Sequence, residues 1–411
     1  MPLALLLAAS ARSTAEAPRV VGYFAAWSIY GRHYHVSDIP ADLLTHVNYA
    51  FAQVTPAGQC ASIDPHGDQV NFPQLRELKK RHPRLETLIS VGGASHSGNF
   101  SRAASTAESR RALAESCVRF MKEAGFEGID VDWEFPSGDV DKKSFTALLA
   151  ELRTQLDMLE VAENKHYLLT VAGPAGPGRI ANLELDKISA SIDWINLMAY
   201  DFHMPSDPVT NFDAPLYPSS TGPGSPEQRA SYNVDAAVNA YLAAGIAPAK
   251  LNLGVHFSGW GWRGVPKANH GLYQRSLGPA KGKWGAGVFD YREIKNRLLK
   301  HYARYWHREL LVPWLYNPAR RIMISYEDPE SLGRKAEYIK RRQLGGVMIW
   351  QLGADDERHS LLGALHARLR PSASSGLPRK RSNSCAAGFR AGCGALPSRS
   401  GSTPWPCGVP G

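Results

Sequence analysis

The sequence lacks any apolar run of the length that a membrane span requires. The run from Leu3 to Ala9, like every other, is far short of the ~20 consecutive apolar residues that cross a bilayer. Cysteine is also scarce: there are 5, an odd number, and only Cys60 and Cys117 lie outside the C-terminal segment. These absences argue against a transmembrane helix and against the disulfide framework typical of small secreted domains.

Acidic residues are absent from residues 371–411, which carry five basic ones. The formal net charge of the whole chain is +9, so this segment supplies more than half of the excess. The remaining asymmetry is too small to indicate a nucleic-acid partner. The segment is also rich in Ser, Gly and Pro and has no hydrophobic periodicity, so we expect a disordered tail.

The N-terminus is rich in alanine and lacks a basic segment ahead of its apolar run. Ala9-Ser10-Ala11 and Ala15-Glu16-Ala17 both have the spacing of signal-peptidase sites. We therefore expect residues 1–17 to be a signal peptide and the protein to be secreted to the extracellular space or the periplasm. A disordered leader is the alternative.

Short apolar stretches bounded by turn residues alternate with stretches of helical periodicity. Helices are predicted at 101–125, 141–160, 227–244 and 330–343, and strands at 19–26, 43–54, 84–93, 126–136, 166–173, 192–201, 250–257 and 344–352. Strands that are apolar on both faces indicate an all-parallel sheet, and eight is the number that closes a (β/α)8 TIM barrel, an α/β fold. An open doubly wound sheet is the alternative, but GYFAAWSIYG after the first strand is a poor glycine-rich phosphate loop.

The gap between the seventh and eighth predicted strands is far longer than an ordinary connection. It contains a helix-like segment followed by strand-like ones, so we predict a small α+β insertion at 260–322. The barrel would then consist of residues 18–259 and 323–370, with 371–411 as a low-complexity tail.

The stretch FEGIDVDWEFP, residues 126–136, places three carboxylates on alternate positions of a strand. Asp130, Asp132 and Glu134 therefore project from one face, roughly 6–7 Å apart along the strand. At the carboxyl end of a barrel strand, where such enzymes have their sites, crowded acids have at least one raised pKa and can supply a general acid. A structural ion cluster or a divalent-metal site is the alternative, although no His or Asn lies nearby at ligand spacing.

This stretch resembles the signature of glycoside hydrolase family 18, the chitinases and their relatives, written Asp-Gly-x-Asp-x-Asp-x-Glu. Gly128, Asp130, Asp132 and Glu134 match it, and Glu127 replaces its first Asp. Because Glu127 has the opposite strand parity from the catalytic row, the change casts little doubt on activity.

Further motifs with the same resemblance follow in the family's order. Ser90-Val91-Gly92-Gly93 is similar to its Ser-x-Gly-Gly, Met198-Ala199-Tyr200-Asp201 to its Met-x-Tyr-Asp, and Trp350 to the tryptophan that ends the eighth strand. GVFDYREI and LYNPARRIMISYEDPESL resemble the insertion domain of the deep-cleft subgroup.

The resemblance implies a retaining hydrolase of β-1,4-linked N-acetylglucosamine polymers in which the substrate's acetamido oxygen is the nucleophile. Glu134 would be the general acid and base, Asp132 would orient the acetamido group and Asp130 would pair with Asp132. Tyr200 would donate to the acetamido oxygen, and Tyr23 and Ser90 would hydrogen-bond the lower aspartate. The implied substrate-binding residues are Tyr23, Phe51, Ser90, Gly92, Gly93, Phe135, Met198, Asp201, Trp260 and Trp350.

The chain departs from the family around the pocket. Ala94 replaces a stacking Trp, Pro205 and Ser206 lie where another Trp is common, and Ser258 and Trp260 replace a Tyr and an Arg after the seventh strand. We therefore expect an intact catalytic pocket with altered flanking subsites, and poor processive action on crystalline chitin. Trp260 and Trp262 would offer new stacking surfaces or pack under the insertion.

Two other functions remain open at this point. A non-hydrolytic chitin-binding lectin of this family typically lacks the acid Glu or the Asp before it, and both are present here. An endo-β-N-acetylglucosaminidase acting on glycoprotein glycans is the other alternative. We expect chitin or chitooligosaccharides as the partner, a monomer, no nucleic-acid or membrane partner, and neither a cofactor nor a metal.

Overall fold

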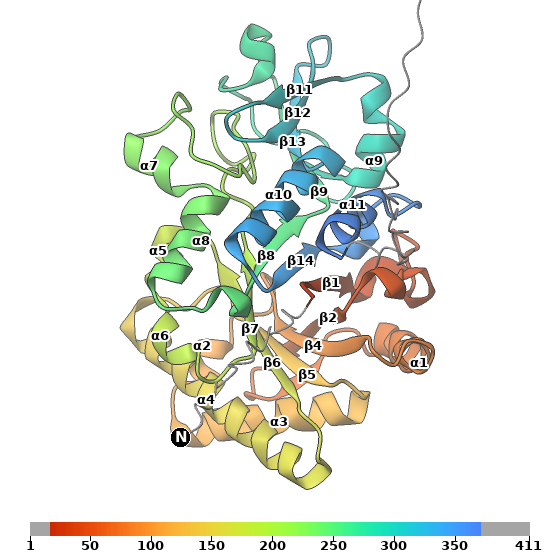
Figure 1. The fold of residues 1–411 in the computed structure, drawn as a ribbon, viewed down its shortest axis with the longest axis vertical. Coiled ribbons are helices and arrows are strands. Elements are labelled where there is room, and N and C mark those ends of the chain that lie inside the picture. Colours follow the sequence, from red (N-terminus) through yellow and green to blue (C-terminus); the bar gives the residue numbers. More distant parts are fainter. Residues whose placement is uncertain (1–16, 371–411) are drawn as a thin grey trace, which may run out of the picture. The chain divides into compact units, whose positions relative to one another are not determined.

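The computed structural model describes residues 17–370. The expected C-terminal tail, and the expected leader apart from Ala17, lie outside the described residues. Eight parallel strands form a closed barrel in this part of the chain (Figure 1). They are β1 (Arg19–Ala25), β2 (His46–Val54), β4 (Glu86–Gly92), β5 (Gly128–Asp132), β6 (Leu168–Pro174), β7 (Trp194–Met198), β8 (Leu251–His256) and β14 (Gly346–Trp350).

The barrel closes because β1 pairs with β14 on one side and with β2 on the other. The predicted (β/α)8 barrel is therefore confirmed, and each predicted strand stretch overlaps one barrel strand, with only β6 extending beyond its stretch, by one residue. The short strand β3 (Cys60–Ser62), which the sequence did not predict, runs antiparallel to the end of β2.

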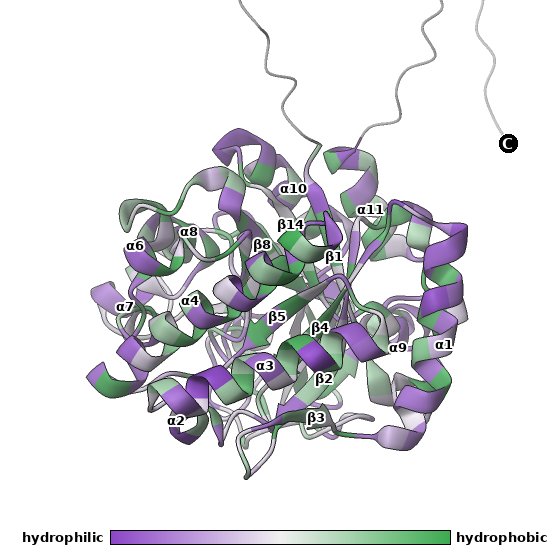
Figure 2. Cartoon of the chain, turned by 90° about the horizontal axis from the view of Figure 1, so that it is seen from below, coloured by the Kyte–Doolittle hydropathy of each residue, from purple (hydrophilic) through white to green (hydrophobic). Residues whose placement is uncertain are grey.

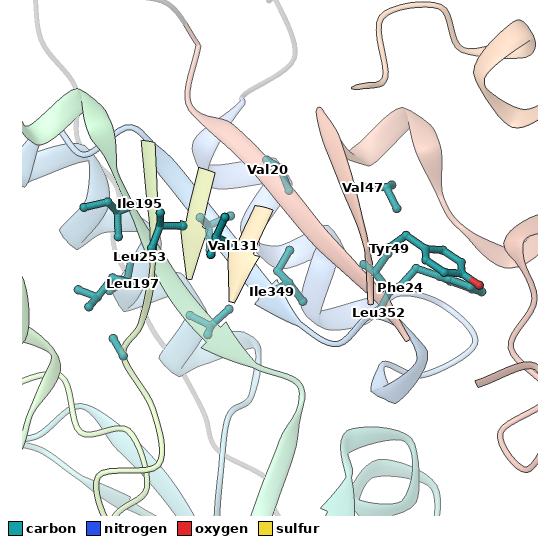
Figure 3. Close-up of a cluster of buried hydrophobic side chains, with 14 of the residues drawn as sticks. Val20, Phe24, Val47, Tyr49, Val131, Ile195, Leu197, Leu253, Ile349 and Leu352 are labelled. Atoms are coloured by element: carbon teal, nitrogen blue, oxygen red, sulfur yellow. The ribbon is translucent and has the colours of Figure 1, made fainter. Parts of the chain in front are cut away.

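Side chains of the barrel strands alternate between two environments, as the period of a strand dictates. The outward set is apolar and belongs to one buried cluster, of which Figure 3 labels Val20, Phe24, Val47, Tyr49, Val131, Ile195, Leu197, Leu253, Ile349 and Leu352. The inward set includes buried polar side chains, among them Tyr23, Asn48, Ser90, Asp130, Thr170, Asn196 and Asn252. The outer layer holds the barrel to its helices, and the inner layer carries the polar groups.

Helices surround the barrel (Figure 2). They are α1 (Pro65–Arg81), α2 (Phe100–Ala103), α3 (Ala107–Ala124), α4 (Gly138–Glu163), α5 (Pro177–Ile180), α6 (Leu185–Ile188), α7 (Pro226–Ser231), α8 (Val234–Ala243), α9 (Tyr291–Asn296), α10 (Pro329–Arg342) and α11 (Ser360–Leu369). Short 3-10 helices lie at Ala26–Ile29, Val36–Asp38, Ala41–Leu43, Pro248–Lys250, Ala268–Gly271, Leu298–Lys300 and Leu352–Ala354.

Local capping explains where the helices differ from their predicted ranges. The predicted helix 101–125 is two helices because Thr106 caps α3, accepting a hydrogen bond from the Ser109 N–H at 3.2 Å. The predicted helix 227–244 is also two, because the Asn233 side chain caps α8 at the Ala236 N–H. Helix α1 was not predicted, since Pro73 lies inside it and proline usually ends a helix.

A second sheet lies between β8 and β14 in the sequence and is antiparallel, with the strand order β10-β9-β13-β12-β11. Its strands are β9 (Ser258–Arg263), β10 (Val288–Asp290), β11 (Ala303–His307), β12 (Val312–Asn317) and β13 (Ile322–Tyr326). The sheet thus starts two residues before the predicted insertion and ends four residues after it. Trp262, Trp314 and Met323 lie in its own buried cluster.

None of the helices within residues 17–370 combines the length and the apolar character that crossing a bilayer needs.

We predict that the outward layer of the barrel carries much of the stability. Val47→Ala, at a fully buried position of this layer, should lower the free energy of unfolding by on the order of 2 kcal/mol, because it removes buried methyl groups and leaves a cavity. The matched control Val161→Ala, on the exposed face of α4 with 86% of the residue accessible, should change it by less than about 0.5 kcal/mol. Urea unfolding measures both, and equal effects would contradict this assignment of the core.

Candidate active site

Four side chains from four strands surround the carboxylate of Asp130, which is fully buried on β5. Tyr23 Oη and Ser90 Oγ donate to Oδ2 at 2.6 and 2.8 Å. Thr170 Oγ1 and Asn196 Nδ2 donate to Oδ1 at 2.5 and 3.2 Å. A carboxylate accepts hydrogen bonds through both of its oxygens, and here each oxygen of Asp130 accepts two at the barrel centre.

Asp132 lies one step further along the same face and is 4% exposed. Burial, followed by the charges of Glu134 and Asp130, raises the pKa of Asp132 well above its usual range. Its Oδ1 atom is buried and has no hydrogen-bond partner within the described part of the chain. The carboxyl of Asp132 is therefore protonated more readily than that of a free aspartate, and one of its oxygens is buried without a partner among the described residues.

Glu134 lies two residues beyond the end of β5, at the rim of the barrel. Burial, then the charge of Asp201, raises the pKa of Glu134 to about 7, while Arg179 and the backbone N–H of Ala94 oppose the rise. A carboxyl with a pKa near neutrality can both give and take a proton at physiological pH. Glu134 thus has the acidity that a general acid and base needs.

The backbone that carries Glu134 is held by Ser97, a buried residue of the loop after β4. Ser97 Oγ accepts the Glu134 N–H at 2.9 Å and lies 2.9 and 3.0 Å from the carbonyl oxygens of Gly93 and Asp132. The Gly93 N–H also donates to the Asp132 carbonyl, at 2.8 Å. These contacts fix the chain between the two acids against the neighbouring loop.

Gly92 and Gly93 permit this close approach of the two backbones. Both have positive φ, +115° and +81°, and a Cβ on Gly92 would lie 2.2 Å from the Asp132 carbonyl oxygen. A Cβ on Gly93 would meet the ring of Phe51 at 2.7 Å. The two glycines therefore leave room for the Asp132 carbonyl and the Phe51 ring, and they are not among the residues that line the cavity.

Tyr200 and Asp201 follow β7 on the opposite side of the cavity. Burial, with the charges of Asp201, Asp132 and Glu134, raises the pKa of Tyr200, so its hydroxyl remains a donor. Burial and the charge of Asp213 raise the pKa of Asp201 to about 6. Trp260 Nε1 donates to Asp201 Oδ1 at 2.7 Å, which partly opposes that rise.

Behind Asp201 lies a buried ion pair between His256 and Asp213. Asp213 Oδ1 also accepts the Asp201 N–H at 2.6 Å, which holds Asp201 at its positive φ of 60°. Burial opposes the charged form of His256, but the carboxylate of Asp213 outweighs it and raises the pKa of His256. The pair thus supports the backbone of Asp201 through Asp213, while His256 lines the cavity.

Aromatic rings form the remaining wall of the cavity, whose volume is about 490 Å³. Trp350 lies parallel to Phe51, with ring centroids 5.7 Å apart, and meets Tyr23 edge-on, also at 5.7 Å. Trp27, in the 3-10 helix after β1, lies next to both Phe51 and Trp350 and is 42% exposed. Such faces suit the C–H side of a sugar ring.

Most of the residues singled out in the sequence line this one cavity. They are Tyr23, Phe51, Asp132, Glu134, Met198, Tyr200, Asp201, Trp260 and Trp350. Asp130 and Ser90 lie beneath it. Phe135 is not among the lining residues and instead lies under the guanidinium of Arg179, 4.0 Å from the ring centroid. In the strand alternation, Phe135 belongs with Ile129, Val131 and Trp133, on the face opposite the three acids, and the sequence alone shows this.

Sequence reasoning missed several residues around the cavity. Trp27 and His256 line it, Ser97 braces Glu134, and Arg179 acts on the pKa values of both Glu134 and Asp201. Of the two tryptophans expected either to offer a stacking surface or to pack under the insertion, Trp260 lines the cavity. Trp262 is fully buried in the second sheet.

Known proteins resemble the chain over nearly all of its described length. The model of the family "Glycosyl hydrolases family 18" matches residues 19–355. Chitinase A1 of Niallia circulans is 38% identical over 84% of this chain, which spans 58% of the length of that protein. Chitinase B of Serratia marcescens is 34% identical over 80% of this chain and 77% of its own.

A solved structure gives the same result for the fold. Chitinase ChiA74 from Bacillus thuringiensis matches with a TM-score of 0.81 and 33% identity, over 86% of this chain and 70% of that one. The family model, the relatives and the geometry of the acids agree, and the chain belongs to glycosyl hydrolase family 18.

Proposed function

We propose that the protein is a chitinase that hydrolyses β-1,4 bonds between N-acetylglucosamine units by a retaining, substrate-assisted mechanism. The observation that carries the proposal is the pair formed by Glu134, whose pKa is raised to about 7, and Asp132, whose pKa is raised by burial and whose Oδ1 has no hydrogen-bond partner within the described residues. The two lie in one cavity with the hydroxyl of Tyr200 and the ring of Trp350. The curated names of the relatives, chitinase A1 and chitinase B, support the same reading.

The first step is cleavage of the glycosidic bond. Glu134 protonates the bridging oxygen as the acetamido oxygen of the same sugar attacks the anomeric carbon, giving a cyclic oxazolinium-type intermediate. Tyr200 donates to the acetamido oxygen and holds it in line for the attack. The sugar rests on Trp350, so the nucleophile comes from the substrate and no second carboxylate has to attack.

The intermediate carries positive charge on its nitrogen, next to Asp132. A nearby cation favours the ionised form of a carboxyl, so Asp132 passes its proton to the carboxylate of Asp130 beneath it. The ionised Asp132 then stabilises the positive charge through the acetamido N–H that it accepts. Glu134, now ionised, then takes a proton from water, which adds to the anomeric carbon and restores the original configuration.

We also propose that chitin or chitooligosaccharides bind along this cavity, that the protein works as a monomer, and that it is secreted. The alanine-rich N-terminal sequence supports the last point. The presence of both Asp132 and Glu134 favours hydrolysis over a lectin role. Ala94 leaves one end of the cavity without a stacking ring, which favours soluble chains over crystalline chitin.

The first experiment is the hydrolysis of N-acetylchitohexaose by the wild type and by Glu134→Gln. We expect the wild type to release products that are initially β-anomers, and the variant to lose at least ~10³-fold in kcat, because it lacks the general acid. The control Glu77→Gln, exposed on α1, should keep full activity. Chromatography measures the lengths of the products, and NMR identifies their anomers. If the wild type binds the oligosaccharide without cleaving it, a lectin role is favoured. An initial α-anomer would refute the retaining mechanism.

The pH dependence should follow the protonation of Glu134. Since the acid form is required and its pKa is about 7, kcat/KM should fall as the pH rises through about 7. Arg179→Gln removes a cation that lowers this pKa, so the alkaline limb should move upward; Asp201→Asn removes an anion that raises it, so the limb should move downward. Each shift should be roughly 0.5–1 pH unit.

Added salt and a distant arginine variant are the controls for Arg179→Gln and Asp201→Asn. Arg179 is exposed, so added salt should shrink its effect, and Arg119→Gln on the outer face of α3 should leave the profile unchanged. Shifts in the same direction for Arg179→Gln and Asp201→Asn would show that Glu134 does not set the alkaline limb.

A further inference from the structure

Two buried cysteines meet where the hairpin β2–β3 packs against α3. Cys60 opens β3 and Cys117 lies in the middle of α3, and they are 9% and 3% exposed. Both belong to the hydrophobic cluster on the outside of the barrel. They are separated by 57 positions in the sequence, so the fold, and not their spacing, brings them together.

The backbone around this pair is held in register. The Cys60 N–H donates to Ser116 Oγ at 2.9 Å, and Ser116 Oγ donates to the Leu113 carbonyl of α3 at 2.7 Å. Cys60 is therefore fixed directly beside the residue that precedes Cys117. Both cysteines are free thiols in the structure, and the neighbouring Cys117 thiol, followed by burial, raises the pKa of the Cys60 thiol.

We propose that Cys60 and Cys117 form a disulfide when the chain folds in an oxidising environment. The hydrogen bond from the Cys60 N–H to Ser116 Oγ already ties Cys60 to the residue next to Cys117, whereas cysteines that lie far apart cannot be bridged without backbone movement. A metal is a poorer explanation of the pair, because no group of three His, Cys, Asp or Glu suited to a metal ion occurs among residues 17–370.

The oxidant is a small-molecule or protein disulfide, for which glutathione disulfide is the probe. The thiolate of one cysteine attacks a sulfur of glutathione disulfide and releases one glutathione thiolate. The second cysteine thiolate then attacks the mixed disulfide and releases another. The two cysteines lose two electrons and two protons, and the glutathione disulfide takes up the same number.

The reaction belongs to folding rather than to the folded protein. Both thiols are buried, and the thiolate is the attacking form, so the native state reacts slowly in either direction. Once formed, the bond ties the hairpin to α3. The same hairpin holds the loop after β4, through Asn99 Nδ2 on the Val54 carbonyl at 2.9 Å and Arg102 on the Pro56 carbonyl, and that loop carries Ala94 to the cavity.

The test is to refold the full-length chain with glutathione disulfide or with a reductant and to map the peptides without reduction. We expect a cross-linked peptide containing Cys60 and Cys117, lighter by two hydrogen atoms than the reduced pair. We expect the Tm of the oxidised protein to be higher by about 5 °C, because the bond closes a long loop in the unfolded chain.

Matched variants separate this bridge from others. The redox-dependent shift in Tm should vanish in Cys60→Ser and in Cys117→Ser, and should persist when Cys385, Cys393 and Cys407 are all replaced by Ser. Absence of the Cys60–Cys117 peptide, persistence of the shift in either single variant, or its loss in the triple variant would each overturn the proposal. The wild-type peptide map decides the matter even where a single variant fails to fold.

Discussion

The hydrogen-bonded carboxylate of Asp130 is the constraint on which the rest of the site depends. A buried charge is tolerated only where donors replace the water it has lost, and here the donors come from β1, β4, β6 and β7. They converge only if these strands have the register of a closed barrel. The closure of the barrel and the charge at its centre therefore support each other, and Asp132 and Glu134 above take their positions from the same strand.

The charges are graded from the centre of the barrel to its rim. Asp130 is surrounded by hydrogen-bond donors. Burial and two neighbouring acids raise the pKa of Asp132, which also has an oxygen without a partner among the described residues. The pKa of Glu134 is raised by burial and by Asp201 and lowered by Arg179. Burial and the charges of neighbouring acids thus raise the pKa values of the upper two acids. Acids this close together titrate as a coupled group and not as independent carboxyls.

The fold was predictable from the sequence because its signals are periodic. Strands apolar on both faces gave the parallel barrel, and the alternation through Asp130, Asp132 and Glu134 gave the catalytic face. Signals without a period were missed: Trp27 and Ser97 lie on short turns, and Arg179 lies in a helix of four residues. Helix α1 was not predicted because Pro73 lies inside it. Phe135 has the parity of the outward-facing residues and is not among the residues that line the cavity.

Asp201 receives its hydrogen bond from the indole of Trp260, at a position where the family pattern would lead one to expect an arginine. An indole N–H is a neutral donor, so it stabilises the ionised carboxyl of Asp201 less than a guanidinium at the same place would. Burial and Asp213 are then the dominant influences, and the pKa of Asp201 settles at about 6. Because the charge on Asp201 is what raises the pKa of Glu134 after burial, a residue outside the row of acids sets the pH range over which the row can work. The same ring lines the cavity, so Trp260 contributes both to the cavity wall and to the pKa of Asp201.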